Sequence, residues 1–177
     1  MNQILFKVII ESDGKEVHAH RLSYEETASL VNNAPDHESS ERLYFWAAQH
    51  PANAVRESVA YKEKLSSETV DILSQDTSIP VLRYIVRNAQ FKYTATLELL
   101  QRLIELDIEI ATSIASDLET YSEAGSLALA KVLAEHPDPA VPYALAGNYR
   151  APKKVLEHLL EHSDTQVARE ARRNLQN

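Results

Sequence analysis

The chain has 177 residues, of which 44% are hydrophobic and 25% are charged, and its formal net charge is −8. This balance is typical of a soluble globular protein, and the length is sufficient for one domain with a sizeable core. The chain has no cysteine, which excludes disulfides and thiolate chemistry and is compatible with a reducing cytoplasm. The acidic balance argues against nucleic-acid binding, which requires cations to neutralise phosphates.

The first ten residues, MNQILFKVII, are apolar but have neither the basic segment nor the cleavage site of a signal peptide. Lys7 interrupts the apolar run and Glu11 ends it, so the run is too short to span a membrane. We therefore expect a cytoplasmic protein with no membrane segment.

The first expected element is a β-hairpin formed by residues 3–11 and 15–22 around Asp13-Gly14. Asp-Gly is a strong signal for a two-residue type I′ turn, in which both residues have positive φ. The turn sets a register in which Phe6 pairs with Arg21, Val8 with Ala19 and Ile10 with Val17 on one face. Ile9 pairs with His18 and Lys7 with His20 on the other face. The first face is mostly apolar and should pack on the rest of the protein.

His18 and His20 thus share a face of the hairpin, as two metal ligands would. Lys7 opposite His20 disfavours a bound cation, so a solvated face is the favoured interpretation. The free edge of the hairpin offers a route to a homodimer through strand pairing.

A short helix should follow the hairpin, because Ser23 and Glu26 have the spacing of a capping box. It is expected to reach about Val31, and a polar loop over 34–40 should lead to a helix over 41–50, with Ser39 or Ser40 as its cap. The expected organisation is therefore an N-terminal part, residues 1–40, packed on a helical part, residues 41–177.

The helical part contains an internal repeat. AAQHPANAV (47–55) matches LAEHPDPAV (133–141), and LEHSDTQV (160–167) matches more loosely. An apolar anchor residue recurs every 26 to 31 residues, and seven residues after each anchor comes Lys, Asn or Asp. We expect Asn at this eighth place to end a helix, because it tolerates the left-handed conformation. The anchors are Val55, Val81, Ile110, Val141 and Val167, and the eighth places are Lys62, Asn88, Asp117, Asn148 and Asn174.

A second helix is expected after each of the first four anchor segments, with apolar residues at spacings of three and four. The expected starts of these helices are Ser66 or Ser67, Thr94 or Thr96, Ser122, and Pro152. Paired helices at this period predict an α-solenoid, in which each unit buries its face on its neighbours.

The motif V-R-x-x-V-A-x-(N/K), with its short period, resembles the leucine-rich-repeat-variant and HEAT-like repeats of bacterial proteins. VRESVAYKEKLSSETVDILSQD (55–76) is the most similar segment, followed by VPYALAGNYRAPKKVLEHLLEHSD (141–164). The resemblance covers about residues 41–177 and implies a mainly α fold: a solenoid of paired helices behind an N-terminal β-hairpin and short helix. Members with an iron–sulfur cluster use cysteines, which this chain lacks, and the fold alone does not imply a function.

His158, Glu161 and His162 have the H-x-x-E-H spacing of one class of zinc peptidases. His162, however, aligns with His50 and His136 at the end of a repeat, and no third ligand is visible. We interpret these repeat-end histidines as partners of the carbonyls at a helix C-terminus. Binding of a metal by His158 and His162, as neighbours four residues apart on a helix, remains the alternative.

No other pattern indicates catalysis: the chain has three glycines, no G-x-S-x-G motif and no cysteine. The sequence therefore predicts a non-enzymatic scaffold or adaptor, without a cofactor, that binds a protein or peptide. Trp46, Tyr61 and Tyr149 are the candidate anchors for that partner, because aromatic residues are enriched in such contacts. The alternative is a HEAT-like protein that processes nucleic acid. The glutamates on the second helices disfavour it, because they would repel phosphates.

Overall fold

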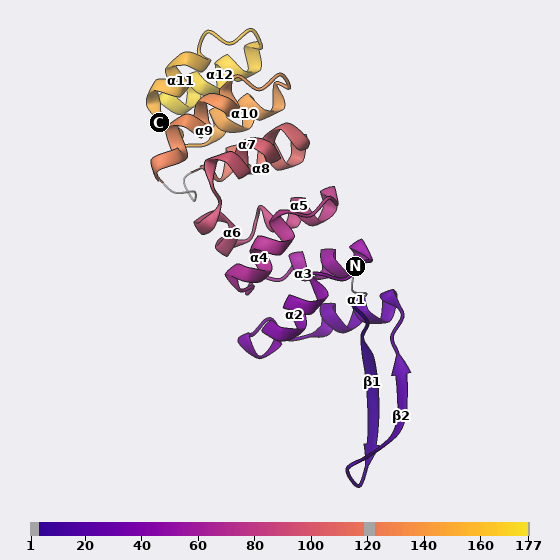
Figure 1. The fold of residues 1–177 in the computed structure, drawn as a ribbon. Helices are drawn as coiled ribbons and strands as arrows, with labels where there is room; N and C mark the ends of the chain where they lie inside the picture. The colour runs from indigo at the N-terminus through magenta and orange to yellow at the C-terminus, as the bar shows by residue number, and fades with distance from the viewer. Residues whose placement is uncertain (1–3, 119–122, 177) are drawn as a thin grey trace. The chain divides into compact units, whose positions relative to one another are not determined.

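The computed structural model describes residues 4–118 and 123–176 of the chain, which divides into two compact units, Met1–Phe91 and Lys92–Asn177. The described residues are mainly α-helical and begin with an antiparallel β-hairpin (Figure 1). The boundary expected near residue 40 falls inside the first unit.

The first unit contains the hairpin and the helices up to α5, and α6 spans the division between the units. Its elements are β1 (Lys7–Ser12), β2 (Lys15–Arg21), α1 (Tyr24–Asn33), the 3-10 turn η1 (Glu38–Ser40), α2 (Glu41–Ala47), α3 (Asn53–Ala60), α4 (Ser67–Ser74), α5 (Ile79–Ile85) and α6 (Ala89–Thr94). The second unit contains α7 (Leu97–Leu106), α8 (Ile108–Ser116), α9 (Glu123–Ala134), α10 (Ala140–Gly147), α11 (Lys153–Leu159) and α12 (Thr165–Leu175).

The turn of the hairpin is confirmed, since Asp13 and Gly14 have φ values of 51° and 71°. The expected register holds only next to the turn, at Glu11–Glu16 and Ser12–Lys15. An irregularity beyond Glu11 adds Val17 to β2, so the remaining expected pairs are wrong by one residue. A β-bulge of this kind is not encoded in the turn residues, and it changes the partner of every residue beyond it. The observed pairs are Lys7–Arg21, Val8–His20, Ile9–Ala19 and Ile10–His18.

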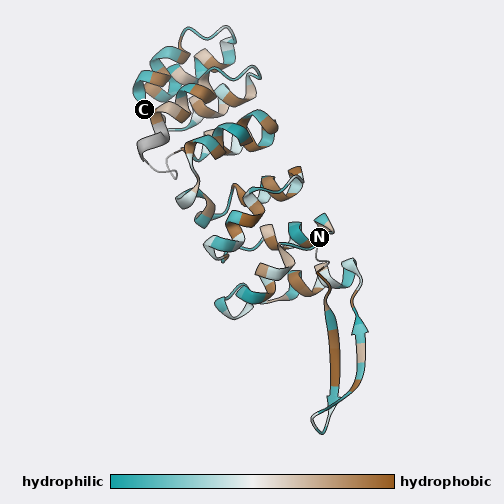
Figure 2. Ribbon diagram, in the orientation of Figure 1, coloured by the Kyte–Doolittle hydropathy of each residue, from teal (hydrophilic) through white to brown (hydrophobic). Residues whose placement is uncertain are grey.

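The hairpin projects from the helices of the first unit, and the residues of both strands are exposed along their length (Figure 1). The expected packing of its apolar face is therefore wrong. Contact with the helices is made at the base, where the rings of Phe6 and His50 lie 6.2 Å apart. Figure 2 shows the consequence: β1 carries a hydrophobic stretch in a position open to solvent.

Helix α1 begins with the expected capping box. Ser23 Oγ accepts a hydrogen bond from the backbone N–H of Glu26 at 3.2 Å, and Glu26 Oε2 accepts one from the backbone N–H of Ser23 at 2.8 Å. Ser40 precedes α2 as expected but makes no capping hydrogen bond through its side chain. Ser66 and Thr96 cap α4 and α7, and Pro152 stands directly before α11. Ser122, the remaining expected start, lies outside the described residues.

The anchor residues form the core, as expected from the repeat: each of the five is 0% exposed. The helices that carry them pack in series within each unit, and α1 extends the series of the first unit. In the first unit α1 contacts α3 and α3 contacts α5; in the second α8 contacts α10 and α10 contacts α12. The second helices cover this series, with α4 against α5 and with α9 and α11 against α10 and α12.

Candidate functional site

The asparagines at the eighth place connect consecutive repeats through their side chains. In each case Nδ2 donates to two backbone carbonyls at or just after the end of the preceding anchor helix. We call this series the asparagine ladder. Its hydrogen bonds are Asn88 to Lys62 O and Glu63 O (both 3.0 Å), Asn148 to Ala115 O and Ser116 O (3.0 and 3.1 Å), and Asn174 to Ala146 O and Asn148 O (both 2.7 Å).

The expected reason for asparagine at this place is therefore wrong. Among the described residues that are not glycine, positive φ occurs only at Asp13, and Asn148 itself has a φ of −75°. The asparagine supplies two amide hydrogens to carbonyls that a helix end leaves unpaired. Lys62 does the same with a longer side chain, since its Nζ donates to Asn32 O at 2.9 Å and Ala34 O at 3.0 Å, at the end of α1.

The repeat-end histidines also act differently from the expectation. They were expected to interact with the carbonyls at the end of a helix, but their Nδ1 atoms accept hydrogen bonds from the backbone N–H two residues later. A neutral imidazole can accept in this way and a protonated one cannot. Asp76 occupies the same place in its repeat. The bonds run from Ala52 N to His50 (3.1 Å), Ser78 N to Asp76 (2.8 Å), Asp138 N to His136 (3.1 Å) and Asp164 N to His162 (3.0 Å).

His50 is the buried member of this set, and burial lowers its pKa, with a further contribution from the positive charge of Arg56. Because the folded-state pKa lies below that of the unfolded chain, the neutral ring stabilises the fold fully above pH ~6.5. That contribution is lost as the pH falls below this value and through the folded-state pKa.

Replacing His50 with asparagine should remove part of this acid sensitivity, because an amide oxygen can accept from Ala52 without titrating. We expect the free energy of unfolding of His50→Asn, measured by urea titration, to decline less than that of the unmodified protein between about pH 7 and about pH 5. Equal declines in the two proteins would show that His50 does not carry the effect. His37→Asn, at an exposed histidine with a similar local hydrogen bond, is the control.

The H-x-x-E-H segment does not form a helical pair of metal ligands. Helix α11 ends at Leu159, so His158 is helical and His162 lies beyond the end. His158 Nε2 lies 2.8 Å from Glu135 Oε1, and His162 Nδ1 accepts from Asp164. Among the residues that the structure describes, no group of three or more histidine, aspartate or glutamate side chains is placed to hold a metal ion.

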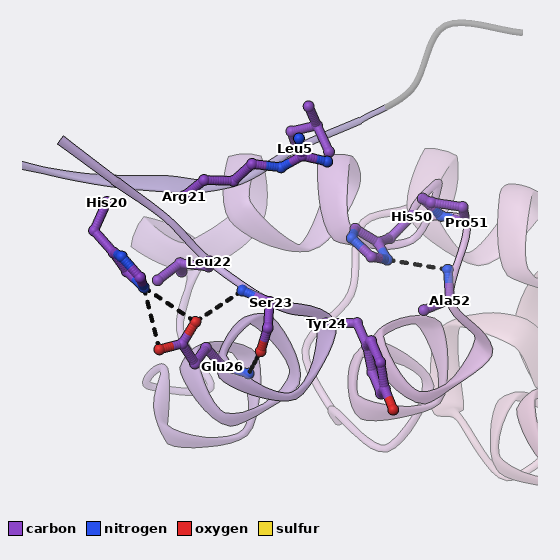
Figure 3. A pocket seen from close by; sticks show the side chains of 10 residues that line it. All are labelled: Leu5, His20, Arg21, Leu22, Ser23, Tyr24, Glu26, His50, Pro51 and Ala52. Carbon is purple, nitrogen blue, oxygen red and sulfur yellow. Dashed lines mark hydrogen bonds and ion pairs between the residues drawn. The ribbon is translucent and has the colours of Figure 1, made fainter.

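A cavity of about 690 Å³ lies at the base of the hairpin (Figure 3). In its wall, Glu26 accepts from Ser23 and pairs with His20 at 3.3 Å. The bond from Ser23 lowers the pKa of Glu26, and His20 adds to this. Leu5, Leu22 and Pro51 supply apolar walls. These contacts fix the junction of β2 and α1.

A cleft of about 370 Å³ lies between the α3–α4 connection and α5, with Tyr61 and Tyr84 in its wall. The two rings meet edge to face with their centroids 5.5 Å apart. Tyr61 is 68% exposed, so most of its surface is open to solvent. Arg87 lines the same cleft and is exposed, so its guanidinium can donate to the carbonyls of a bound chain.

The backbone that carries Tyr61 is fixed by hydrogen bonds on two sides. Asp36 accepts from the backbone N–H groups of Glu63 and Lys64, at 2.8 and 2.9 Å. Asn88 holds the carbonyls of Lys62 and Glu63 from the other side. An aromatic side chain on a rigid segment loses little conformational freedom when it binds, which is a property of effective interface anchors.

A second cleft, of about 330 Å³, adjoins the first and shares Glu63 and Ala89 with it. Three exposed glutamates line this neighbouring cleft, with Lys64 as its cation; they are Glu38, Glu41 and Glu63. The two clefts together form what we call the aromatic–acidic groove. The groove presents an aromatic pair at one end and negative charge at the other.

The three aromatic residues expected to bind a partner are all exposed, and Trp46 lines neither of the two clefts beside Tyr61. Trp46 is 48% exposed and stacks edge to face on Phe45 at 5.2 Å. Tyr149 is 75% exposed and lies in the second unit, where Arg150 contacts its ring. Tyr84 was missed; it faces Tyr61 from the next repeat, a relation visible only once α3 and α5 are known to be neighbours.

Comparisons of the chain with protein families, with curated proteins and with solved structures gave no match. None of the helices in the described residues is long and apolar enough to cross a bilayer.

Proposed function

We propose that this protein is a non-enzymatic binding module, a short α-solenoid of HEAT-like or leucine-rich-repeat-variant type that acts as a scaffold or adaptor for a protein partner. The anchor helices that pack in series and the asparagine ladder support the solenoid, because both connect equivalent positions of consecutive repeats. The cytoplasm is the proposed compartment, with which the absence of cysteine is compatible.

The observation that carries the proposal is the aromatic–acidic groove. Its aromatic end suits an apolar or aromatic side chain of a bound peptide, since Tyr61 and Tyr84 offer both ring faces and hydroxyl groups. Its acidic end suits a lysine or arginine next to this side chain in the partner. The proposed ligand is therefore an extended segment with an apolar residue next to a basic one.

Peptide display on the full chain tests this proposal. We expect the selected peptides to share an apolar or aromatic residue beside a basic one, and Tyr61→Ala to weaken their binding by at least about tenfold. Tyr61 is largely exposed, so the free energy of unfolding of the variant should change by less than about 0.5 kcal/mol. Calorimetric titration and urea unfolding measure the two quantities.

Tyr93→Ala is the matched control, because Tyr93 is 82% exposed and does not line either cleft. Affinity should be unchanged in this control, and Glu63→Gln should reduce both the affinity and its dependence on salt. Peptides that bind Tyr61→Ala as tightly as the unmodified protein would place the binding site elsewhere and contradict the proposal.

A further inference from the structure

The outer edge of β1 is a free edge of a very small sheet. In the described residues the sheet consists of β1 and β2 alone. The backbone N–H of Leu22 donates to Phe6 O at 2.9 Å, so the even-numbered residues of β1 bond to β2 in the antiparallel alternation. The backbone groups of Lys7, Ile9 and Glu11 consequently point away from β2. A strand edge of this kind is a template for pairing with another strand.

The charges on this edge are poorly placed within the hairpin itself. Lys7 lies opposite Arg21, and Glu11 lies opposite Glu16. Like charges directly opposite each other in an antiparallel pair are destabilising. Each end of β1 would therefore gain from an opposite charge on its outer side.

We propose that two copies of this chain pair through their β1 edges, antiparallel and centred on Ile9, to form a four-stranded sheet. This proposal is independent of the groove described above. The sequence Lys7-Val8-Ile9-Ile10-Glu11 is self-complementary in this register. The resulting pairs, each with a residue of the second copy, are Lys7 with Glu11, Val8 with Ile10, Ile9 with Ile9, Ile10 with Val8 and Glu11 with Lys7.

Pairing in this register places a pair of opposite charge beside each of the two like-charged pairs. Arg21 and Lys7 of one copy continue into Glu11 and Glu16 of the second, all on one face of the sheet, since residues directly opposite share a face. The apolar residues gain cross-strand partners at the same time. Val8, Ile9 and Ile10 are 47%, 41% and 54% exposed in the single chain, and their β-branched side chains favour such partners.

Other pairings of the hairpin lack this complementarity. Parallel pairing of the β1 edges in register sets Lys7 against Lys7 and Glu11 against Glu11. The outer edge of β2 carries the bulge at Val17, which disrupts regular pairing. If the β2 edges of two copies pair antiparallel with their ends aligned, Lys15 of one copy lies opposite Arg21 of the other. The structure therefore assigns the contact to β1 and to one register.

Proline at Ile9 tests the edge without disturbing the hairpin. The N–H of Ile9 points outward, so Ile9→Pro removes a bond only to the second copy. Ala19→Pro is the matched control, because Ala19 lies opposite Ile9 and its N–H points to the outer edge of β2. We expect sedimentation velocity between about 1 and about 500 μM to show a monomer–dimer equilibrium for the full chain and for Ala19→Pro, and a monomer throughout for Ile9→Pro.

Charge reversal tests the register. Lys7→Glu and Glu11→Lys each create two like-charge pairs across the proposed contact, although each improves a pair inside the hairpin. We expect each variant alone to weaken dimerisation by at least about tenfold, and the double variant to restore it. An equimolar mixture of the two single variants should form a heterodimer, since all its terminal pairs are then of opposite charge.

A single cysteine provides an independent measurement, because the chain has none of its own. Ile9→Cys should form a covalent dimer on mild oxidation, since opposite Cα atoms in an antiparallel pair lie within disulfide range. Ala19→Cys should not. A full chain that stays monomeric up to the highest concentration overturns the proposal, as do equal effects of the two prolines or a mixture of single variants that fails to associate.

Discussion

Replacement of Asp76 with asparagine is expected to lower the free energy of unfolding by about 3 kcal/mol, because it removes one partner of a largely buried ion pair. Arg56 Nε and Nη2 donate to the two carboxylate oxygens of Asp76 at 2.6 and 2.9 Å. The side chains are 16% and 5% exposed. Arg56 also donates to His50 O at 2.8 Å, so one guanidinium connects two equivalent positions, the ends of consecutive repeats at His50 and Asp76.

The pH dependence of stability gives a second measurement of the same pair. Burial would raise the pKa of Asp76, but hydrogen bonds from Arg56 and from the backbone N–H of Ser78 outweigh it and hold the pKa below its ordinary value. Stabilisation is therefore complete above the unfolded-state pKa of about 3.9 and is lost as the pH falls through the folded-state pKa. Asp76→Asn should abolish this part of the acid dependence.

Asp71→Asn is the matched control for the change in charge, because Asp71 is an exposed aspartate on the adjacent helix α4. Urea unfolding should give a change below about 0.5 kcal/mol for the control. A comparable loss in both variants would mean that net charge, rather than the pair with Arg56, determines the result. The double-mutant cycle of Arg56→Ala and Asp76→Ala should give a coupling energy of about 1–3 kcal/mol.

Replacement of Asn148 with alanine is expected to cost about 3 kcal/mol of unfolding free energy. The side chain of Asn148 is buried, donates to the carbonyls of Ala115 and Ser116, and accepts from the backbone N–H of Arg150 at 2.9 Å. Each such bond contributes roughly 1 kcal/mol, and a buried group left without its partner is costly. Differential scanning calorimetry and urea unfolding measure the loss.

Asn148→Asp separates the two functions of the amide. The carboxylate can still accept from Arg150, but it cannot donate to the two carbonyls when ionised. We expect it to be at least as destabilising as alanine at neutral pH. Gln166→Ala, at an exposed amide in the same unit, should change stability by less than about 0.5 kcal/mol. A neutral effect of both Asn148 variants would contradict the structural importance of the asparagine ladder.

Local sequence signals were sufficient for the hairpin turn, the start of α1 and the buried anchor residues, but the helix expected over 41–50 ends at Ala47. The capping box of Ser23 and Glu26 and the Asp13-Gly14 turn involve residues that are close in the chain, and both are confirmed. The anchor residues are all buried, because their recurrence reports which side of each helix faces its neighbours. The arrangement of the repeats as a solenoid remains a proposal.

Interactions between distant residues account for what the sequence did not reveal. The eighth-place asparagine was recognised, but its partners lie 25 to 33 residues away in the preceding repeat. The cleft of Tyr61 and Tyr84 likewise requires the packing of α3 on α5. The hairpin register failed for a different reason: one extra residue in β2 reverses the face of all that follow, and no residue type signals it.

The asparagine ladder also determines how the length of this chain can change. Each rung donates from one repeat to the end of the repeat before it, and in the second unit Asn148 both donates to α8 and accepts, through its backbone carbonyl, from Asn174. A duplicated repeat with asparagine at its eighth place would bring its own donor and its own pair of acceptors. Duplication of such a whole repeat therefore preserves every rung, whereas insertion of part of one leaves carbonyls unpaired.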